Sequence, residues 1–72
     1  MDLQVQFGLR VKELRLKIGL SQEALAYKAG IDRTYMTGVE TGKRNVSAKN
    51  MDKIIKALEL PVPEFFNSAL FN

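Results

Sequence analysis

Residues 21–42 read SQEALAYKAGIDRTYMTGVETG, and this stretch decides the fold. It predicts two short helices, over residues 22–29 and about 33–40, because a good N-cap residue precedes each of them. These caps are Ser21 and Asp32, whose side-chain oxygens can accept from the backbone N–H groups of a first turn. A glycine ends the first helix, so only three residues separate the two. Such a short connection forces a steep angle between them, which is the architecture of a helix-turn-helix.

The rest of the chain predicts three more helices, because its apolar residues recur at intervals of three and four rather than two. One helix is expected over residues 3–18 and another after the capping residue Ser47. A last helix is expected over about 64–70, with Pro63 in its first turn. The expected fold is therefore all-α, with five helices in a single domain over residues 1–72.

The 72 residues include no Cys and no His. A chain of this length buries only about 60% of the surface of its unfolded state, so its core is marginal without further support. The missing residue types exclude disulfides, the usual zinc sites and catalysis by Cys or His, which leaves a partner subunit as support. No apolar run approaches a membrane span, and the N-terminus lacks the pattern of a secretory signal, so we expect a cytoplasmic protein without membrane contact.

The second helix of the helix-turn-helix has a polar outer face. Met36 and Val39 fall on its buried side, and Arg33, Thr34 and Thr37 fall on the opposite side. Outward Arg and Thr residues are most often simply solvated. Here, however, they follow a tight turn, and recognition in the major groove requires such side chains near the start of a helix. Arginine can bridge O6 and N7 of guanine, and threonine can offer its hydroxyl to a base or its methyl to thymine.

Cations lie beside this face. Lys43 and Arg44 follow the helix directly, and the whole chain carries a net charge of +3. Gln22 begins the preceding helix, where the amide and the helix dipole suit a phosphate. These observations together predict binding of double-stranded DNA, with no cofactor and no metal.

Several motifs at fixed spacing carry a family resemblance. They are Phe7-Gly8, Leu14-Arg15, Gly19-Leu20-Ser21-Gln22-Glu23, Leu25-Ala26, Ala29-Gly30-Ile31, Val39-Glu40 and Gly42-Lys43-Arg44-Asn45. With them the chain resembles the XRE (Cro/C1-type) helix-turn-helix family of phage and bacterial repressors over residues 7–60. Residues 32–40 further look like the controller proteins of restriction-modification systems, which are small dimeric regulators.

The resemblance implies a lambda-repressor-like fold and roles for individual positions. The base-facing positions are Arg33, Thr34 and Thr37. The positions that contact the phosphate backbone are Gln22, Lys43, Arg44 and Asn45. Gly38 stands where the family often has a longer side chain, so readout is expected to depend on Arg33, Thr34 and the deformability of the DNA. Tyr35 is a further candidate contact there if it is partly exposed.

Arg15 and Glu40 match a pair that joins the first helix to the end of the third in this family. Glu40 borders the buried side of its helix, so a half-desolvated carboxylate there needs a partner. The alternative is two independent surface charges with negligible coupling. We expect the ion pair, with the remaining donors of Arg15 reaching phosphate.

The C-terminal segment, about 63–71, is rich in apolar residues, which are Phe65, Phe66, Leu70 and Phe71. They could all pack inside the monomer, but we expect one or two inside and the rest in an isologous homodimer interface. The resemblance also implies dimers. A dimer would place two recognition helices about 34 Å apart, which matches successive major grooves of a partly palindromic operator.

Several functions stay open. The favoured one is an autoregulatory controller of a restriction-modification system, and the alternative is a phage-type repressor or an antitoxin-like module acting with a protein partner. RNA polymerase is a further candidate partner, through Glu23 and Asp52. An enzyme would need Glu23, Asp52 and Glu59 to act together, but their spacing forms no catalytic or metal-binding constellation, so no enzymatic activity is expected.

Overall fold

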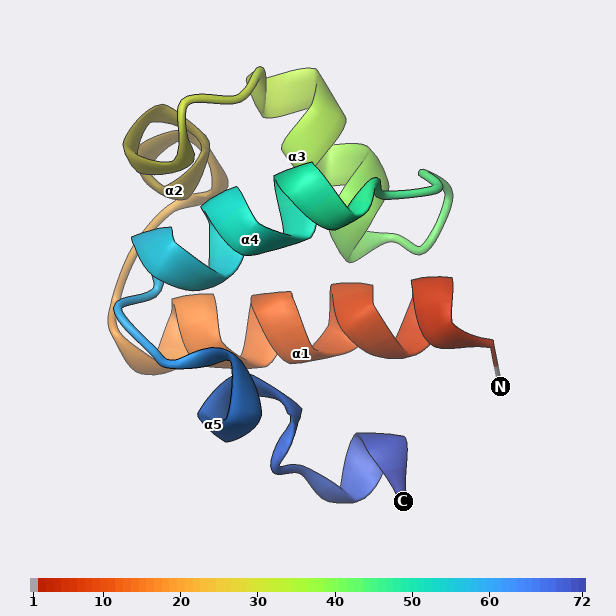
Figure 1. The fold of residues 1–72 in the computed structure, drawn as a ribbon. Helices are drawn as coiled ribbons and strands as arrows, with labels where there is room; N and C mark the ends of the chain where they lie inside the picture. The colour runs from red at the N-terminus through yellow and green to blue at the C-terminus, as the bar shows by residue number, and fades with distance from the viewer. Residues whose placement is uncertain (1) are drawn as a thin grey trace.

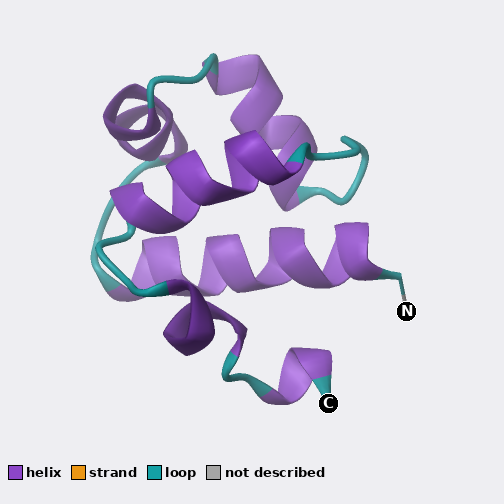
Figure 2. Cartoon of the chain, viewed as in Figure 1, coloured by secondary structure: helices purple, strands orange, loops and turns teal. Residues whose placement is uncertain are grey.

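The computed structural model describes residues 2–72, which form five α-helices and a short 3-10 helix (Figure 1). The elements are α1 (Leu3–Lys17), α2 (Gln22–Ala29), α3 (Arg33–Glu40), α4 (Ala48–Ala57), α5 (Val62–Phe66) and η1 (Ala69–Phe71). Figure 2 shows helices and loops only over these residues, which confirms the predicted all-α class. None of the described helices combines the length and the apolar character that crossing a membrane requires.

Side chains cap four of the helices. Asp2, Ser21, Asp32 and Ser47 each accept from a backbone N–H of the first turn that follows, at 2.9 to 3.2 Å. Replacing one such cap by alanine typically costs about 0.5–2 kcal/mol. Local sequence therefore determines where α1 to α4 begin. The caps Ser21 and Asp32 are the two from which the sequence predicts the helix-turn-helix.

The helices enclose one apolar core. α3 packs against α1 and α2, and α4 packs against α2 and α5. In Figure 1, α5 lies below α1. The largest fully buried side chains come from every α-helix and are Phe7, Val11, Leu25, Met36, Val39, Ile54, Ile55 and Phe65. The core therefore holds α2 and α3 as one rigid unit on α1 and α4.

Gly8 explains how closely α1 and α3 approach each other. A Cβ atom at this position would overlap the carbonyl oxygen of Val39 and lie 3.2 Å from that of Glu40. Both obstacles are backbone atoms, which cannot move aside as a flexible side chain could. Only glycine fits where α1 passes the end of α3, so this position sets the depth at which α3 is seated.

The C-terminal segment corrects the prediction of one helix over about 64–70. α5 ends at Phe66, Ser68 has an extended backbone, and a separate 3-10 helix follows. Arg10 of α1 supplies a physical reason, because its guanidinium donates to the carbonyl oxygens of Phe65 (2.7 Å) and Glu64 (3.2 Å). These are carbonyls that further turns of α5 would use, so this contact favours ending the helix over continuing it. The expected position of Pro63 in the first turn is confirmed.

The aromatic side chains of this segment divide between core and surface. Phe65 is fully buried, with its ring centroid 5.1 Å from that of Phe7. Phe66 and Phe71 are half-buried, and their ring centroids lie 4.9 Å apart. Phe65 is therefore an aromatic residue that packs inside the monomer, as expected of one or two of them, and it is not available to a dimer interface.

Candidate nucleic-acid interface

The turn between α2 and α3 aims the outer face of α3 away from the molecule. Gly30 adopts the left-handed conformation that ends α2, with φ of 71°, and Ile31 packs against the core. Arg33, Thr34 and Thr37 are exposed on α3, as the sequence predicted. These three side chains project from one compact helical surface.

Arg33 is free to meet a ligand. Its side chain is 68% exposed, and the nearest acidic group, the carboxylate of Glu23, lies 3.9 Å away. An exposed pair at this distance contributes little, so a stronger partner can displace it. Thr34 is exposed beside it, and its backbone N–H donates to the cap Asp32 at 2.9 Å.

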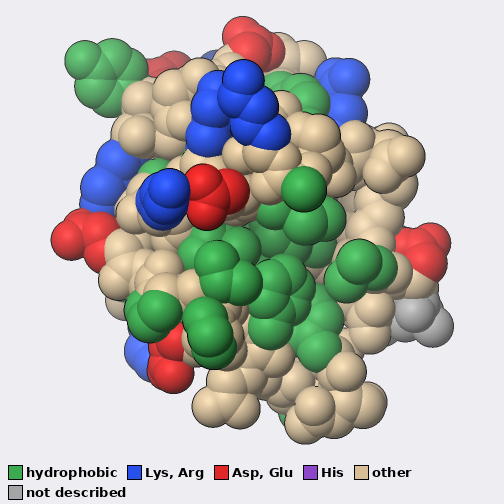
Figure 3. All heavy atoms as spheres, viewed as in Figure 1, with side chains coloured by type: hydrophobic (Ala, Val, Ile, Leu, Met, Phe, Trp, Pro, Cys, Tyr) green, Lys and Arg blue, Asp and Glu red, His purple; other side chains and the backbone are tan. Residues whose placement is uncertain are grey.

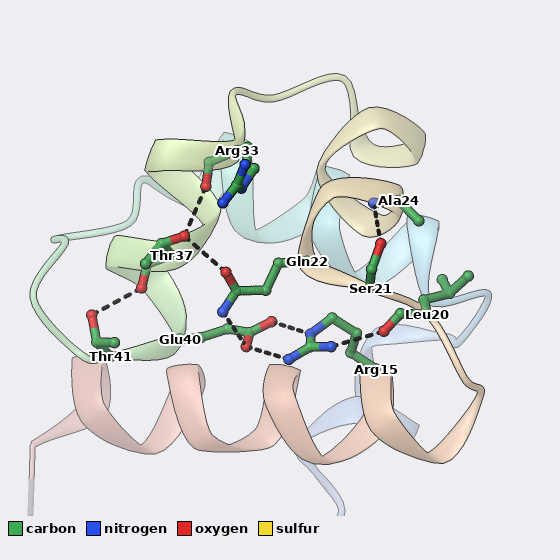
Figure 4. Close-up of polar contacts among 9 residues, drawn as sticks. All are labelled: Arg15, Leu20, Ser21, Gln22, Ala24, Arg33, Thr37, Glu40 and Thr41. Atoms are coloured by element: carbon green, nitrogen blue, oxygen red, sulfur yellow. Dashed lines mark hydrogen bonds and ion pairs between the residues drawn. The ribbon is translucent and has the colours of Figure 1, made fainter.

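A buried ion pair connects α1 to the end of α3 (Figure 4). Arg15 donates from Nε to Oε2 of Glu40 at 2.6 Å and from a terminal nitrogen to Oε1 at 2.9 Å. A third donor of Arg15 reaches the carbonyl oxygen of Leu20 at 2.8 Å. The hydrogen bond to Glu40 raises the pKa of Arg15 above its usual value, although burial acts in the opposite direction. The two side chains expected to pair are thus joined by a bidentate contact.

The same network extends to the outer face of α3. Gln22 donates from Nε2 to Oε1 of Glu40 at 3.1 Å, and its Oε1 accepts from the hydroxyl of Thr37 at 2.8 Å (Figure 4). The carboxamide of Gln22 therefore bridges the buried carboxylate and an exposed residue of α3. Its side chain ties α2 to α3, while the N-terminus of α2 stays exposed around Ser21 and Glu23.

Burial corrects the role expected of Arg15 toward phosphate. Its side chain is only 8% exposed, and three of its donors are bonded to Glu40 and Leu20. A guanidinium in this position has no free access to a DNA backbone. Arg15 is better assigned to holding α3 in place.

The loop after α3 folds back onto the helix end. The backbone N–H groups of Lys43 and Arg44 both donate to the carbonyl oxygen of Gly38, at 2.9 and 3.1 Å. Val46 is buried, whereas the side chains of Lys43, Arg44 and Asn45 are exposed. The structure thus places the predicted cations and Asn45 beside α3 on a loop with a defined path.

Tyr35 has surroundings that the sequence did not predict. It is half-buried, its hydroxyl accepts from Nδ2 of Asn50 at 3.1 Å, and Cζ of Arg44 lies 4.8 Å from its ring centroid. A Cβ atom on Gly38 would lie 3.3 Å from Cβ of Arg44, so the glycine makes room for that side chain. Asn50 escaped sequence reasoning because its partner belongs to another helix, and no local pattern indicates such a contact.

The acidic residues considered for catalysis are dispersed. Glu59 pairs with Lys28 at 2.6 Å, a hydrogen bond that lowers the pKa of Glu59, and Asp52 pairs with Lys56 at 2.9 Å. Over residues 2–72 there is neither a pocket nor a cluster of residues able to hold a metal ion. By contrast, the outer face of α3 and its flanking loop group exposed polar and basic side chains on one surface.

Comparisons with known proteins agree with this geometry. The helix-turn-helix family model matches residues 11–65. The control protein C.MunI of Mycoplasma sp is 43% identical over 67 residues, which cover 92% of this chain and 90% of that protein.

Two similar solved structures are also controller proteins. The restriction-modification controller protein C.AhdI from Aeromonas hydrophila has a TM-score of 0.83 at 51% identity, covering 88% of this chain and 96% of its own. The restriction-modification controller protein C.Esp1396I, solved as a tetramer with its natural 35-base-pair operator, has a TM-score of 0.87 at 39% identity. That match covers 92% of this chain and 87% of the other. The resemblance expected from the sequence is confirmed: the chain belongs to the XRE-type helix-turn-helix family, among the DNA-binding controller proteins of restriction-modification systems.

Proposed function

We propose that this protein binds a partly palindromic operator as a homodimer and thereby controls the genes of a restriction-modification system, its own gene included. The observation that carries this proposal is the exposed face of α3, with Arg33, Thr34 and Thr37 held in place by the buried pair of Arg15 and Glu40. An outward polar helix on a rigid support is what insertion into a major groove requires. The protein would act in the cytoplasm, with the DNA that it binds.

Base reading falls to α3. Arg33 reaches O6 and N7 of a guanine, and Thr34 contacts the neighbouring base. The hydroxyl proton of Thr37 is directed to Gln22, so Thr37 offers a base its acceptor oxygen and its methyl group. Tyr35 is half-buried at the edge of this face, where it can contact the DNA at a base-pair step whose shape is deformed on binding.

Phosphate contacts fall to the elements that flank α3. From the loop, one DNA strand is bound at its phosphates by Lys43, Arg44 and Asn45. The N-terminus of α2 around Gln22 binds another phosphate through its free backbone N–H groups. The ion pair of Arg15 and Glu40 contacts no DNA in this arrangement. It keeps α3 at the depth and angle that let the other residues reach the groove.

The dimer would form through the face of α4 and α5. Figure 3 shows hydrophobic side chains gathered over the centre and lower part of the face that Figure 1 presents, where α4 lies above α1 and α5 below it. Val62 is 46% exposed between exposed prolines, and Met51 and Phe66 are half-buried. With the buried Phe65 excluded, we assign the interface to Met51, Val62 and Phe66, and retain Leu70 and Phe71, both half-buried, at its edge. A second copy related by a two-fold axis would cover this surface.

RNA polymerase is a candidate partner where the regulator activates. Glu23 is exposed in the first turn of α2, with its side chain 78% accessible, whereas Asp52 is engaged by Lys56. We therefore assign the acidic contact to Glu23. It lies close to the DNA-binding surface, where a polymerase bound to adjacent DNA could reach it.

A reporter under the DNA upstream of the protein's own gene tests the proposal. Increasing doses of wild-type protein should change reporter expression, and Arg33→Ala should require higher doses for the same response. The matched control is Lys28→Ala, which removes one positive charge from the last turn of α2, at the opposite end of that helix from Gln22. Expression that ignores the dose of wild-type protein, together with no selective binding to this DNA in a gel shift, would refute the proposed function.

A further inference from the structure

Tyr35 is held by a residue outside the helix-turn-helix. Its hydroxyl accepts a hydrogen bond from Nδ2 of Asn50 at 3.1 Å, and both residues are half-buried. The two side chains come from α3 and α4, and the bond spans 15 positions of sequence. A single polar contact therefore joins the recognition helix to α4 at the edge of the DNA-facing surface.

The position of Asn50 is itself well fixed. Its backbone N–H donates to the hydroxyl of the cap Ser47 at 3.2 Å, which places Asn50 in the first turn of α4. A residue in a capped first turn has little freedom of its backbone. The carboxamide thus extends from a rigid base toward Tyr35.

The ring of Tyr35 in turn supports Arg44. Cζ of Arg44 lies 4.8 Å from the ring centroid, within the range of a cation–π contact. The backbone N–H of Arg44 donates to the carbonyl oxygen of Gly38 at 3.1 Å, and the missing Cβ of Gly38 lets the Arg44 side chain approach α3. Arg44 is therefore held at two points, its backbone N–H and its guanidinium, although its side chain is exposed.

We propose that Asn50 is a positioning residue for DNA recognition, which acts through the hydroxyl of Tyr35 to orient the ring on which Arg44 rests. This inference depends on the proposed function, since it concerns how the DNA-binding surface is prepared. A long arginine loses rotamer freedom when it binds, and holding it beforehand lowers that loss. This gain in affinity appears only on DNA whose sequence lets Tyr35 and Arg44 make their contacts together. Asn50 therefore contributes more to selectivity for the operator than to affinity for DNA in general.

A double-mutant cycle tests the proposal. Dissociation constants are measured for wild type, Asn50→Ala, Tyr35→Phe and the double variant, at one stated salt concentration. The probes are an upstream duplex that wild type binds selectively and a random duplex of equal length. Each single variant should weaken binding to the selective duplex by about two- to tenfold, the range of one neutral hydrogen bond, and should leave the random duplex within about twofold. The double variant should bind like either single variant, because both changes remove the same contact.

Asn72→Ala is the matched control. The C label in Figure 1 marks its position, below α1 and away from α3, and its substitution should leave both dissociation constants unchanged. Tyr35→Phe keeps the ring and the core packing, so it tests the proposal even where Asn50→Ala fails to fold.

The outcomes separate the two levels of inference. Wild type that binds both duplexes equally would defeat the proposed function itself. Two results would overturn the role of Asn50 alone while wild type still binds the upstream duplex selectively. In the first, the fold-losses of the two single variants multiply in the double variant; in the second, each variant loses as much affinity for the random duplex as for the upstream one. A purely structural role of Asn50 would lower the melting temperature of the variant. It would leave unchanged the ratio of the two dissociation constants, measured at a temperature well below melting, and that result would also overturn the proposal.

Discussion

Replacing Glu40 by alanine should destabilise the protein far more than the loss of an ordinary ion pair. The Glu40 side chain is 1% exposed and holds two donors of Arg15, at 2.6 and 2.9 Å. Its removal leaves the guanidinium of Arg15 buried with only the carbonyl oxygen of Leu20 among these partners. Breaking a buried pair in this way costs about 3–5 kcal/mol. The free energy of unfolding of a domain of this size is only about 5–10 kcal/mol, so the substitution would remove much of its stability.

Urea denaturation and thermal melting, both followed by circular dichroism, measure this loss. At about 4–8 °C per kcal/mol, the melting temperature of Glu40→Ala should fall by at least about 12 °C. The matched control is Glu13→Ala, whose carboxylate is 56% exposed and pairs with Arg10 on the surface, and which should cost no more than about 1 kcal/mol. A loss for Glu40→Ala as small as that of the control would refute the reasoning.

Removing both charges together separates stability from binding. The double variant Arg15→Met with Glu40→Leu should recover most of the lost stability, since apolar residues of similar volume can replace a buried pair. It should still bind operator DNA more weakly, because Gln22 loses the carboxylate that aligns it with Thr37. A stable double variant with the affinity of wild type would show that the pair has no part in positioning α3.

Four further results are expected. Gly8→Ala should destabilise the fold by at least about 1–3 kcal/mol in urea denaturation, because its methyl meets the backbone of α3; unchanged stability would contradict the close helix approach. Arg33→Ala should cost about 1–3 kcal/mol on the operator and relax the preference at one base pair, whereas equal losses on random DNA would remove it from base reading. Lys43→Ala should weaken both kinds of binding and lower the salt slope by about one, and an unchanged slope would place this side chain in solvent. The pKa of Glu59, followed by NMR, should rise toward its ordinary value in Lys28→Ala. Because the pKa of Glu59 is lower in the folded than in the unfolded state, the ion pair adds a small stabilisation above the unfolded-state pKa. This stabilisation is lost as the pH falls through the folded-state pKa.

Local signals in the sequence predicted the arrangement around the turn well. Ser21 and Asp32 cap the two helices of the helix-turn-helix at the expected positions. Capping and termination depend on a few neighbouring residues, so the sequence suffices for them. The exposed face of α3 followed from helical periodicity for the same reason.

Contacts between distant segments set the limit of such reasoning. The break after α5 is favoured by Arg10, which lies 55 positions before Phe65 and takes its carbonyl oxygen. The bond between Asn50 and Tyr35 likewise depends on how α3 and α4 pack. Helical periodicity also could not decide which C-terminal aromatic faces the core, because the helix that it assumed is interrupted.

Selection of bound sequences from a random duplex pool tests the central claim most directly. The purified protein should recover, at a stated salt concentration, a two-fold-symmetric motif with half-sites about one helical turn apart. The same selection with Arg33→Ala should lose the preference at one position of each half-site, which identifies the base that Arg33 reads. Recovery of no motif, or of the same motif with both proteins, would contradict recognition of an operator by α3.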